Sequence, residues 1–290
     1  MILDTAQAAE TTPRSSEGQG DTGLPRPVLE LSGLTLRYGR QLAVEAVSLV
    51  LRAGDRVAVV GPNGAGKSSL FKAITGILTP SAGSIRVHGH GPGQDTCVAY
   101  VPQRSAVDWS FPLTVADVVM MGRAAQVGLM RRPGAEDHRR VAASLEVLRL
   151  GHLADRRIAE LSGGQQQRMF IARALAQDAE LVLMDEPFSG LDAPSREDVL
   201  SALDDLDARG VAVLLATHDL RLASERFEQV LLLNHRLVAY GPPDVVITDA
   251  NLHAAFGGRM HAIETQHGKI FFGDAGCEEH DHPRVPEVGP

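Results

Sequence analysis

Two stretches near the amino end of the chain alternate apolar and polar side chains with a period of two. The first runs over residues 28–38 and ends at Tyr38, and the second runs over 47–51 before a turn at 53–55. Alternation of this kind is typical of strands with one face in a core and the other towards solvent. The pattern therefore predicts an antiparallel β subdomain at the start of the ordered chain.

Three later stretches are apolar without interruption and have the length of strands. They span residues 56–61, 181–187 and 211–219. Continuous apolar runs of this length are typical of parallel strands that are covered on both faces. Helical patterns at 194–208 and 219–227 follow the last two runs. The alternation of buried strands and helices predicts a βαβ core.

Between the first and second of these runs the apolar spacing becomes helical. Residues 107–160 are predicted to be largely helical, within an insert of about 107–175. Thr114 and Asp117 have the spacing of a capping box, and residues 135–150 have apolar side chains at intervals of three to four. The predicted fold class is α/β, with an antiparallel β subdomain and a helical insert.

The two ends of the chain have a different composition. Residues 1–27 are rich in small and polar side chains and are predicted to form a disordered leader, so the ordered domain is expected over 28–257. The extension 258–290 contains two short apolar stretches, which predict strands, and then a polar tail expected to be disordered. That tail has Cys277, His280 and His282 in a spacing that could ligate a divalent metal, or it is solvated and binds nothing.

Composition and charge narrow the class of protein. The 290 residues are 44% hydrophobic, which suffices for a large core, and the net charge of -8 argues against a nucleic-acid partner. The longest apolar runs are far shorter than the roughly 20 residues of a transmembrane helix. No secretory signal precedes them, and two distant cysteines fit a reducing compartment. A cytosolic location is expected.

The segment GPNGAGKSS has the pattern of a phosphate-binding loop, because it follows a buried strand and opens a helix. Backbone N–H groups of such a loop surround phosphate, Lys67 adds a full positive charge, and Ser68 is placed to ligate Mg²⁺. The pattern indicates a P-loop NTPase core that binds a nucleotide with Mg²⁺. The predicted phosphate cradle consists of Gly61, Pro62, Asn63, Gly64, Ala65, Gly66, Lys67, Ser68 and Ser69.

An acidic pair ends the second buried strand. Asp185 and Glu186 lie at the carboxyl end of LVLMD, where open α/β sheets bind their ligands. Asp185 is predicted to hold Mg²⁺ through Ser68 and water, and Glu186 to accept a proton from the attacking water. Beside a P-loop, this is favoured over a merely solvated acidic pair.

A second helix start is marked by LSGGQ. Ser162 and Gln165 have the spacing of a capping box, and Gly163 and Gly164 would let a phosphate approach bare backbone. On capping grounds alone the segment is only a helix N-terminus. In a chain that already has one phosphate cradle, it predicts a second half-site for another molecule's nucleotide.

Taken in order, GPNGAGKSS, LSGGQ, LMDEP, SGLD and ATHD resemble the ATP-binding subunits of ABC transporters, from about residue 28 to 257. The resemblance implies that Tyr38 stacks on adenine and that Gln103 contacts Mg²⁺ near the γ-phosphate. In the same way it implies that Gln103, Asp192 and His218 assist hydrolysis. It also implies that two copies of the chain enclose two ATP molecules, with Lys67 of one copy facing Ser162 of the other. Each of these residues alone has an ordinary structural explanation, and their joint order favours the family.

The stretch 101–114 is unusual because it has neither helical nor strand period and contains the only tryptophan. In ABC transporters the segment after the glutamine at this place faces the membrane partner. The resemblance therefore implies that Trp109, Phe111, Met120 and Met121 contribute to a docking cleft for a permease helix. The alternative is that these side chains pack the helical insert.

The segments VPQR, VDWSFP and VMMGR, in this order, are also similar to segments of the ATP-binding subunits of manganese, zinc and iron chelate importers. The function implied is an ATPase that powers uptake of a divalent metal through a separate permease. An extracytoplasmic substrate-binding protein would deliver the metal to that permease. Such a subunit is peripheral, on the cytoplasmic face of the membrane. The alternatives are a haem or ferric-siderophore importer and a soluble ABC ATPase without a permease. Export fits less well.

Overall fold

The computed structural model describes residues 27–93, 97–128, 130–257, 260–265 and 268–273. The predicted leader and the polar tail with Cys277, His280 and His282 lie outside the described residues, apart from Pro27. Over the described ranges, none of the helices combines the length and apolarity that a membrane span requires.

A six-stranded sheet forms the centre of the fold, in the order β5-β6-β7-β3-β8-β9. Its first five members run parallel and β9 pairs antiparallel with β8. The three predicted buried strands are confirmed as β3, β6 and β7. The strands are β3 (Arg56–Val60), β5 (Val98–Val101), β6 (Leu181–Asp185), β7 (Ala212–Thr217), β8 (Gln229–Asn234) and β9 (Arg236–Gly241).

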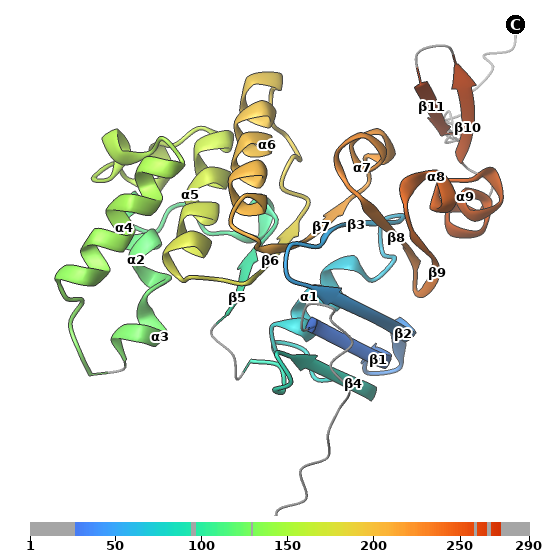
Figure 1. The fold of residues 1–290 in the computed structure, drawn as a ribbon, viewed down its shortest axis with the longest axis horizontal. Coiled ribbons are helices and arrows are strands. Elements are labelled where there is room, and N and C mark those ends of the chain that lie inside the picture. The colour runs from blue at the N-terminus through green and yellow to red at the C-terminus, as the bar shows by residue number, and fades with distance from the viewer. Residues whose placement is uncertain (1–26, 94–96, 129, 258–259, 266–267, 274–290) are drawn as a thin grey trace, which may run out of the picture.

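The predicted antiparallel subdomain is a three-stranded sheet in the order β2-β1-β4. It consists of β1 (Pro27–Tyr38), β2 (Gln41–Arg52) and β4 (Ala82–Val87). The helix α1 (Lys67–Ile74) lies close to this sheet at the lower right of Figure 1. The two alternating stretches of the sequence pair with each other. Alternate side chains of a strand share one face, so this pairing places the apolar residues of both strands on the same side of the sheet.

The two faces of the parallel sheet pack against different partners. Along β3, Ala58 and Val60 belong to a core shared with the helical insert, whereas Val57 and Val59 belong to a core shared with α1 and the antiparallel sheet. Successive side chains of a strand point to opposite faces, so each strand contributes to both cores. The continuous apolar pattern of these strands is a consequence of this double coverage.

The helical insert lies on the left of Figure 1 and packs on one end and one face of the parallel sheet. Thr114 and Asp117 form the predicted capping box at the start of its first helix. The prediction was wrong for residues 107–113, which form turns, because the carboxylate of Asp108 accepts from the backbone N–H of Ser110 at 3.0 Å and Pro112 follows. The helices are α2 (Val115–Met121), α3 (Ala124–Val127), α4 (Ala135–Val147) and α5 (Gly163–Ala176).

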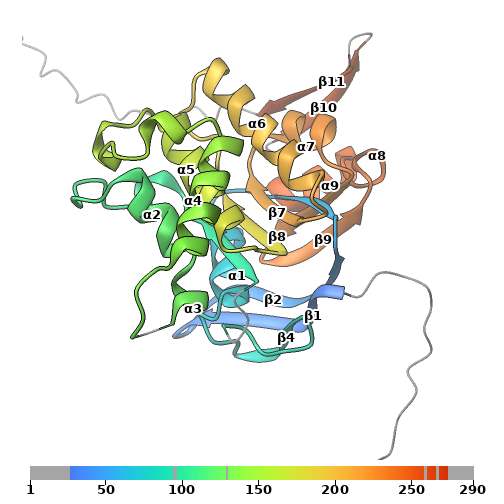
Figure 2. The ribbon, with the colours of Figure 1, turned by 60° about the vertical axis from the view of Figure 1, so that its left-hand side comes forward.

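The remaining elements complete the carboxyl-terminal half. Both predicted helices after β6 and β7 are confirmed, and so are the two short strands of the extension, which pair as a hairpin. Figure 2 shows α6 and α7 beside each other on the face that also holds the insert. These elements are α6 (Ala193–Asp207), α7 (Leu220–Arg226), α8 (Pro243–Val246), α9 (Asp249–Phe256), β10 (Met260–Thr265) and β11 (Gly268–Gly273).

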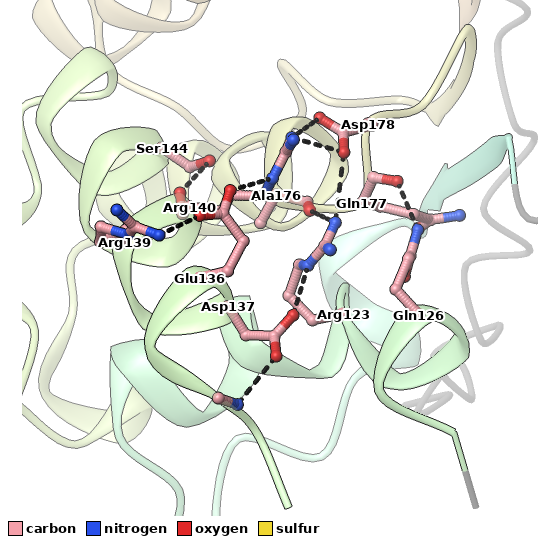
Figure 3. Close-up of polar contacts among 11 residues, drawn as sticks. Arg123, Gln126, Glu136, Asp137, Arg139, Arg140, Ser144, Ala176, Gln177 and Asp178 are labelled. Atoms are coloured by element: carbon pink, nitrogen blue, oxygen red, sulfur yellow. Dashed lines mark hydrogen bonds and ion pairs between the residues drawn. The ribbon is translucent and has the colours of Figure 1, made fainter. Parts of the chain in front are cut away.

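A buried arginine holds the helices of the insert together (Figure 3). Arg123, only 6% exposed, follows α2 and donates to the carbonyl oxygen of Ala176 at the end of α5 at 2.9 Å. It also donates to Asp137 of α4 at 3.1 Å and to Asp178 at 3.2 Å. One guanidinium group therefore joins three segments that lie far apart in the sequence.

Replacing Arg123 with methionine is expected to lower the free energy of unfolding by about 2 kcal/mol, because a buried carbonyl group loses its donor while the side-chain stem is kept. Arg139 provides a matched control, since its side chain is 75% exposed and pairs with Glu136 on its own helix. Arg139→Met should change the free energy of unfolding by less than about 0.5 kcal/mol. Urea denaturation of both variants measures the difference, and equal stabilities would contradict the role of Arg123.

Candidate functional site

Strand register brings the predicted catalytic residues to one edge of the sheet. Val60 of β3 pairs with Thr217 of β7, and Asp185 of β6 pairs with Ala216 of β7. The residues that follow these pairs therefore leave the sheet side by side. Because the carboxyl ends of parallel strands form the ligand-binding edge of an open sheet, the P-loop, the acidic pair and His218 share one site.

The P-loop is held in shape by its own lysine. The Lys67 Nζ atom donates to the carbonyl oxygens of Gly61 at 2.7 Å and Pro62 at 3.0 Å, and the residue is only 6% exposed. Burial lowers the pKa of Lys67, and the negative charges of Glu186 and Asp185 oppose that shift. A positive charge is thus fixed inside the loop, where it can attract phosphate.

Packing requires glycine at two positions of the loop. A Cβ atom at Gly61 would overlap the carbonyl oxygen of Leu233 in β8. At Gly66, which has a φ of +100°, it would overlap the carbonyl oxygen of Ala43 in β2. The loop therefore lies directly against the backbone of both sheets.

His235, which the sequence reasoning missed, fastens the P-loop to these neighbours. Its backbone N–H donates to the carbonyl oxygen of Ala65 at 2.9 Å, and its Nδ1 atom lies 3.1 Å from the carbonyl oxygen of Ala43. His235 has a φ of 56° in the turn between β8 and β9. No motif marks this contact, because it depends on the meeting of three distant segments.

Asp185 lies where a metal ion bound beside the P-loop would need an oxygen ligand. Its side chain accepts a hydrogen bond from the Ser68 hydroxyl, and the Tyr100 hydroxyl donates to it at 3.3 Å. The pKa of Asp185 lies above its usual value because the carboxylate is buried, and the hydrogen bonds from Ser68 and Tyr100 offset part of this rise. A hydroxyl and a carboxylate in contact are the oxygen donors that suit Mg²⁺.

Tyr100 is a second residue that the sequence reasoning missed. It lies on β5, beside β6, and burial together with the charge of Asp185 strongly raises the pKa of its hydroxyl. The hydroxyl therefore remains a donor and orients the carboxylate. Only the pairing of β5 with β6 places it there.

The predicted general base and the predicted histidine lie close together. The Oε2 atom of Glu186 is 3.7 Å from the Nδ1 atom of His218, and the side chains are 16% and 64% exposed. Glu186 has a φ of 48°, an uncommon conformation for this residue type, and its backbone N–H donates to Ala216 at 3.0 Å. Strained backbone of this kind is typical of residues whose side chains must point in one direction.

Three other predicted residues lie at the end of β1, after β5 and before α6. Tyr38 is 47% exposed at the end of β1. Gln103 lines a groove of about 390 Å³ together with Trp109 and Ser189. Asp192 is exposed, and its carboxylate accepts from the backbone N–H of Ser195 at 3.0 Å as the cap of α6, which lowers its pKa. The geometry shows a capping role for Asp192, and its assistance to hydrolysis stays a prediction.

The start of α5 has the predicted capping box, with Ser162 and Gln165 bonded reciprocally. Its glycines also have a packing role that the sequence reasoning did not foresee. A Cβ atom at Gly164 would lie 2.5 Å from the Cβ atom of Ser195, and one at Gly163 would lie 3.0 Å from Leu191. The absence of side chains lets α5 pack tightly on the first turn of α6 and on the loop before it.

The helices that begin with the two predicted phosphate sites lie on opposite faces of the parallel sheet. Leu70 and Phe71 of α1 belong to the core with the antiparallel sheet, whereas Met169 and Phe170 of α5 belong to the core with the insert. Figure 1 shows the same separation. The Ser162 segment and the Lys67 segment therefore lie in different layers of the fold.

The apolar residues predicted to form a docking cleft after Gln103 divide between core and surface. Trp109 packs edge-on against Phe170 of α5, with ring centroids 5.9 Å apart, and its Nε1 atom donates to the Arg104 carbonyl oxygen at 3.0 Å. Met120 also packs against the core. Phe111 and Met121, in contrast, are 57% and 47% exposed. The packing alternative therefore holds for Met120 and partly for Trp109.

The site defines a P-loop nucleoside triphosphatase. Its strand, loop and helix enclose a lysine, and a serine and aspartate pair and a strand-end glutamate lie beside them. Comparison with known proteins narrows this class. Residues 44–189 match the ABC transporter family. The chain belongs to this family and is an ATP-hydrolysing subunit of its type, which confirms the predicted family and fold class.

Individual relatives extend over most of the chain. The zinc transport system ATP-binding protein TroB of Treponema pallidum is 45% identical, over 80% of this chain and 88% of the relative. The manganese transport system ATP-binding protein MntB of Bacillus subtilis is 42% identical, over 80% and 93%. A solved ABC transporter in an inward-facing conformation matches with a TM-score of 0.74 at 31% identity, over 85% of this chain and 96% of that chain.

Proposed function

We propose that this chain is the ATPase subunit of an importer that takes up a divalent metal, manganese, zinc or iron, through a separate membrane permease. The observation that carries the proposal is the 45% identity to a zinc transport protein over 80% of the chain. Manganese transport proteins and a chelated iron transport protein of Yersinia pestis, 41% identical, extend the same group. The subunit would be peripheral, on the cytoplasmic face of the membrane.

We further propose that ATP binds with Mg²⁺ at the edge formed by the P-loop. Ser68 and Asp185 would hold the ion, with Gln103 as a further oxygen ligand, and the ion would neutralise charge on the phosphates. Lys67 would bind the phosphates, and Glu186 would accept the proton of the attacking water. His218, 3.7 Å from Glu186, would orient that carboxylate near the γ-phosphate. Tyr38, exposed at the end of β1, would stack on adenine.

The layered arrangement supports a pair of chains as the working unit. The P-loop opens α1 on one face of the sheet, and Ser162 opens α5 on the other. A helix N-terminus attracts phosphate only within its first turn. The Ser162 segment would therefore serve the nucleotide of a second copy, with Lys67 of one chain facing Ser162 of its partner.

Two exposed apolar side chains support a permease contact. Phe111 and Met121 are 57% and 47% exposed, and Phe111 is two residues from Trp109, which lines the groove that contains Gln103. A helix docked on Phe111 would therefore lie close to a residue proposed to contact Mg²⁺. Movement of the permease and the state of the nucleotide would be coupled through Gln103. An extracytoplasmic substrate-binding protein would act on the permease and not touch this chain.

Phe111→Ser is expected to weaken docking to the permease at least tenfold and leave stability unchanged, because the side chain is 57% exposed. Co-purification with the permease measures docking, and thermal unfolding measures stability. Trp109→Ala is the matched comparison: it should lower stability as well, since Trp109 packs on Phe170. Normal docking of a well-folded Phe111→Ser protein would exclude this surface.

Metal accumulation in cells that lack this chain tests the proposed function. Elemental analysis should show a selective loss of manganese, zinc or iron that the wild-type chain restores and Lys67→Met does not. No change in any of the three metals would contradict metal import. Haem and ferric-siderophore uptake by the same cells would then be measured.

A further inference from the structure

Three potential metal ligands meet at the opposite edge of the sheet from the nucleotide site. His88 lies just after β4, Cys97 just before β5 and Glu180 just before β6. One ligand atom from each lies within 4.8 Å of the others. The cluster therefore combines an imidazole, a thiol and a carboxylate from three separate segments.

Backbone bonds hold these segments in place. The carbonyl oxygen of Cys97 accepts from the backbone N–H groups of Glu180 at 2.8 Å and Leu181 at 3.1 Å. His88 donates its backbone N–H to the carbonyl oxygen of Val28 at 3.0 Å, and it has a φ of 48°. The backbones of Cys97 and Glu180 are thus held side by side, and His88 lies on a strained turn that restricts the direction of its side chain.

The distances fit a tetrahedral ion. The Nε2 atom of His88 lies 3.4 Å from the Oε2 atom of Glu180. Two ligands with metal bonds of about 2.0–2.1 Å stand roughly 3.3 Å apart at a tetrahedral angle. A thiolate sulfur and an imidazole nitrogen bound to the same ion stand about 3.6 Å apart. Because the ligand atoms here lie within 4.8 Å of one another, they would have to approach by at most about 1 Å to bind an ion.

The environment of His88 also points to a ligand. Its Nε2 atom is buried and makes no hydrogen bond within the described part of the chain, although the Glu180 carboxylate is near. A buried polar atom without a partner costs free energy, and a metal ion would satisfy it. A neutral imidazole, a thiolate and a carboxylate suit Zn²⁺, whereas Mn²⁺ prefers oxygen ligands.

We infer that His88, Cys97 and Glu180 form a binding site for a zinc-class divalent ion, with water in the fourth position. The bound ion joins the turn after β4 to the amino ends of β5 and β6. β5 leads to Gln103 and β6 ends at Asp185. The ion therefore fixes the amino ends of the two strands whose carboxyl ends form part of the nucleotide site. This site is separate from the Cys277, His280 and His282 spacing of the tail.

Cobalt binding to the full-length chain tests this site, because a thiolate bound to Co²⁺ gives a charge-transfer absorption in the near ultraviolet. The tail substitutions Cys277→Ser, His280→Asn and His282→Asn form the background, so that Cys97 is the one remaining cysteine. Without nucleotide, one Co²⁺ per chain should bind with this absorption. Zn²⁺ should displace it and raise the melting temperature, and Mn²⁺ should do neither.

Single substitutions in that background assign the ligands. Cys97→Ser should abolish the absorption, and His88→Asn and Glu180→Gln should each weaken Zn²⁺ binding by about tenfold or more. His90→Asn is the matched control, since His90 is exposed two residues from His88 and should bind Zn²⁺ normally. Absorption that survives Cys97→Ser, or that is missing from the tail-substituted background, would overturn the inference. The same holds if the folded background protein fails to bind Co²⁺.

Discussion

Replacing Glu186 with glutamine is expected to lower ATP turnover by about 10²- to 10⁴-fold while ATP binding remains, because the amide keeps the size of the side chain but cannot accept the proton. Glu186 is suited to this role by its position at the end of β6 and by a backbone conformation that directs it towards His218. Phosphate release by the assembled transporter measures turnover, and equilibrium nucleotide binding measures affinity.

The control for this substitution is Glu197→Gln on α6. Its carboxylate is 72% exposed and pairs only loosely with Arg226, at 3.6 Å. Turnover of this variant should equal that of the wild type. If Glu186→Gln also hydrolyses ATP at the wild-type rate, another group accepts the proton and the assignment is wrong.

Lys67→Met is expected to weaken ATP binding by roughly 10- to 100-fold, which corresponds to the loss of a charge-assisted hydrogen bond to phosphate. The methionine keeps the apolar stem that packs in the loop and removes the ammonium group. The same change removes the donor for the carbonyl oxygens of Gly61 and Pro62, so the P-loop without nucleotide should also become less stable. Fluorescent nucleotide titration and thermal unfolding measure the two effects.

Lys72→Met is the control for the charge of Lys67, because Lys72 lies on the same helix but in its last turn. The Lys72→Met protein should bind ATP with wild-type affinity. A Lys67→Met protein that binds ATP as tightly as Lys72→Met would show that the backbone amides alone hold the phosphates.

The sequence was most informative where structure depends on neighbouring residues. The strand before the P-loop, the cap at Thr114 and the cap at Ser162 all follow from local spacing, and each is present. Tyr100 and His235 could not be found in this way. Their contacts with Asp185 and Ala65 depend on the pairing of strands and turns that lie far apart in the sequence.

One wrong prediction and one omission have a related physical cause. The helix predicted over residues 107–113 is absent, because the Asp108 side chain accepts a backbone N–H group and forms a turn. At Gly164 the approach of a phosphate stays a prediction, and the structure adds a packing requirement, because a Cβ atom there would lie 2.5 Å from the Cβ atom of Ser195. Both features depend on one specific contact, and the periodicity of apolar residues contains no information about such contacts.

The single tryptophan gives this protein a built-in optical reporter. Trp109 is half-buried against Phe170 of α5 and lines the groove that contains Gln103. Since the chain has one tryptophan, its emission spectrum under excitation at long ultraviolet wavelengths describes this place alone. Solvent that enters or leaves the groove would shift the emission colour, so events at the surface of the insert can be followed in unlabelled protein.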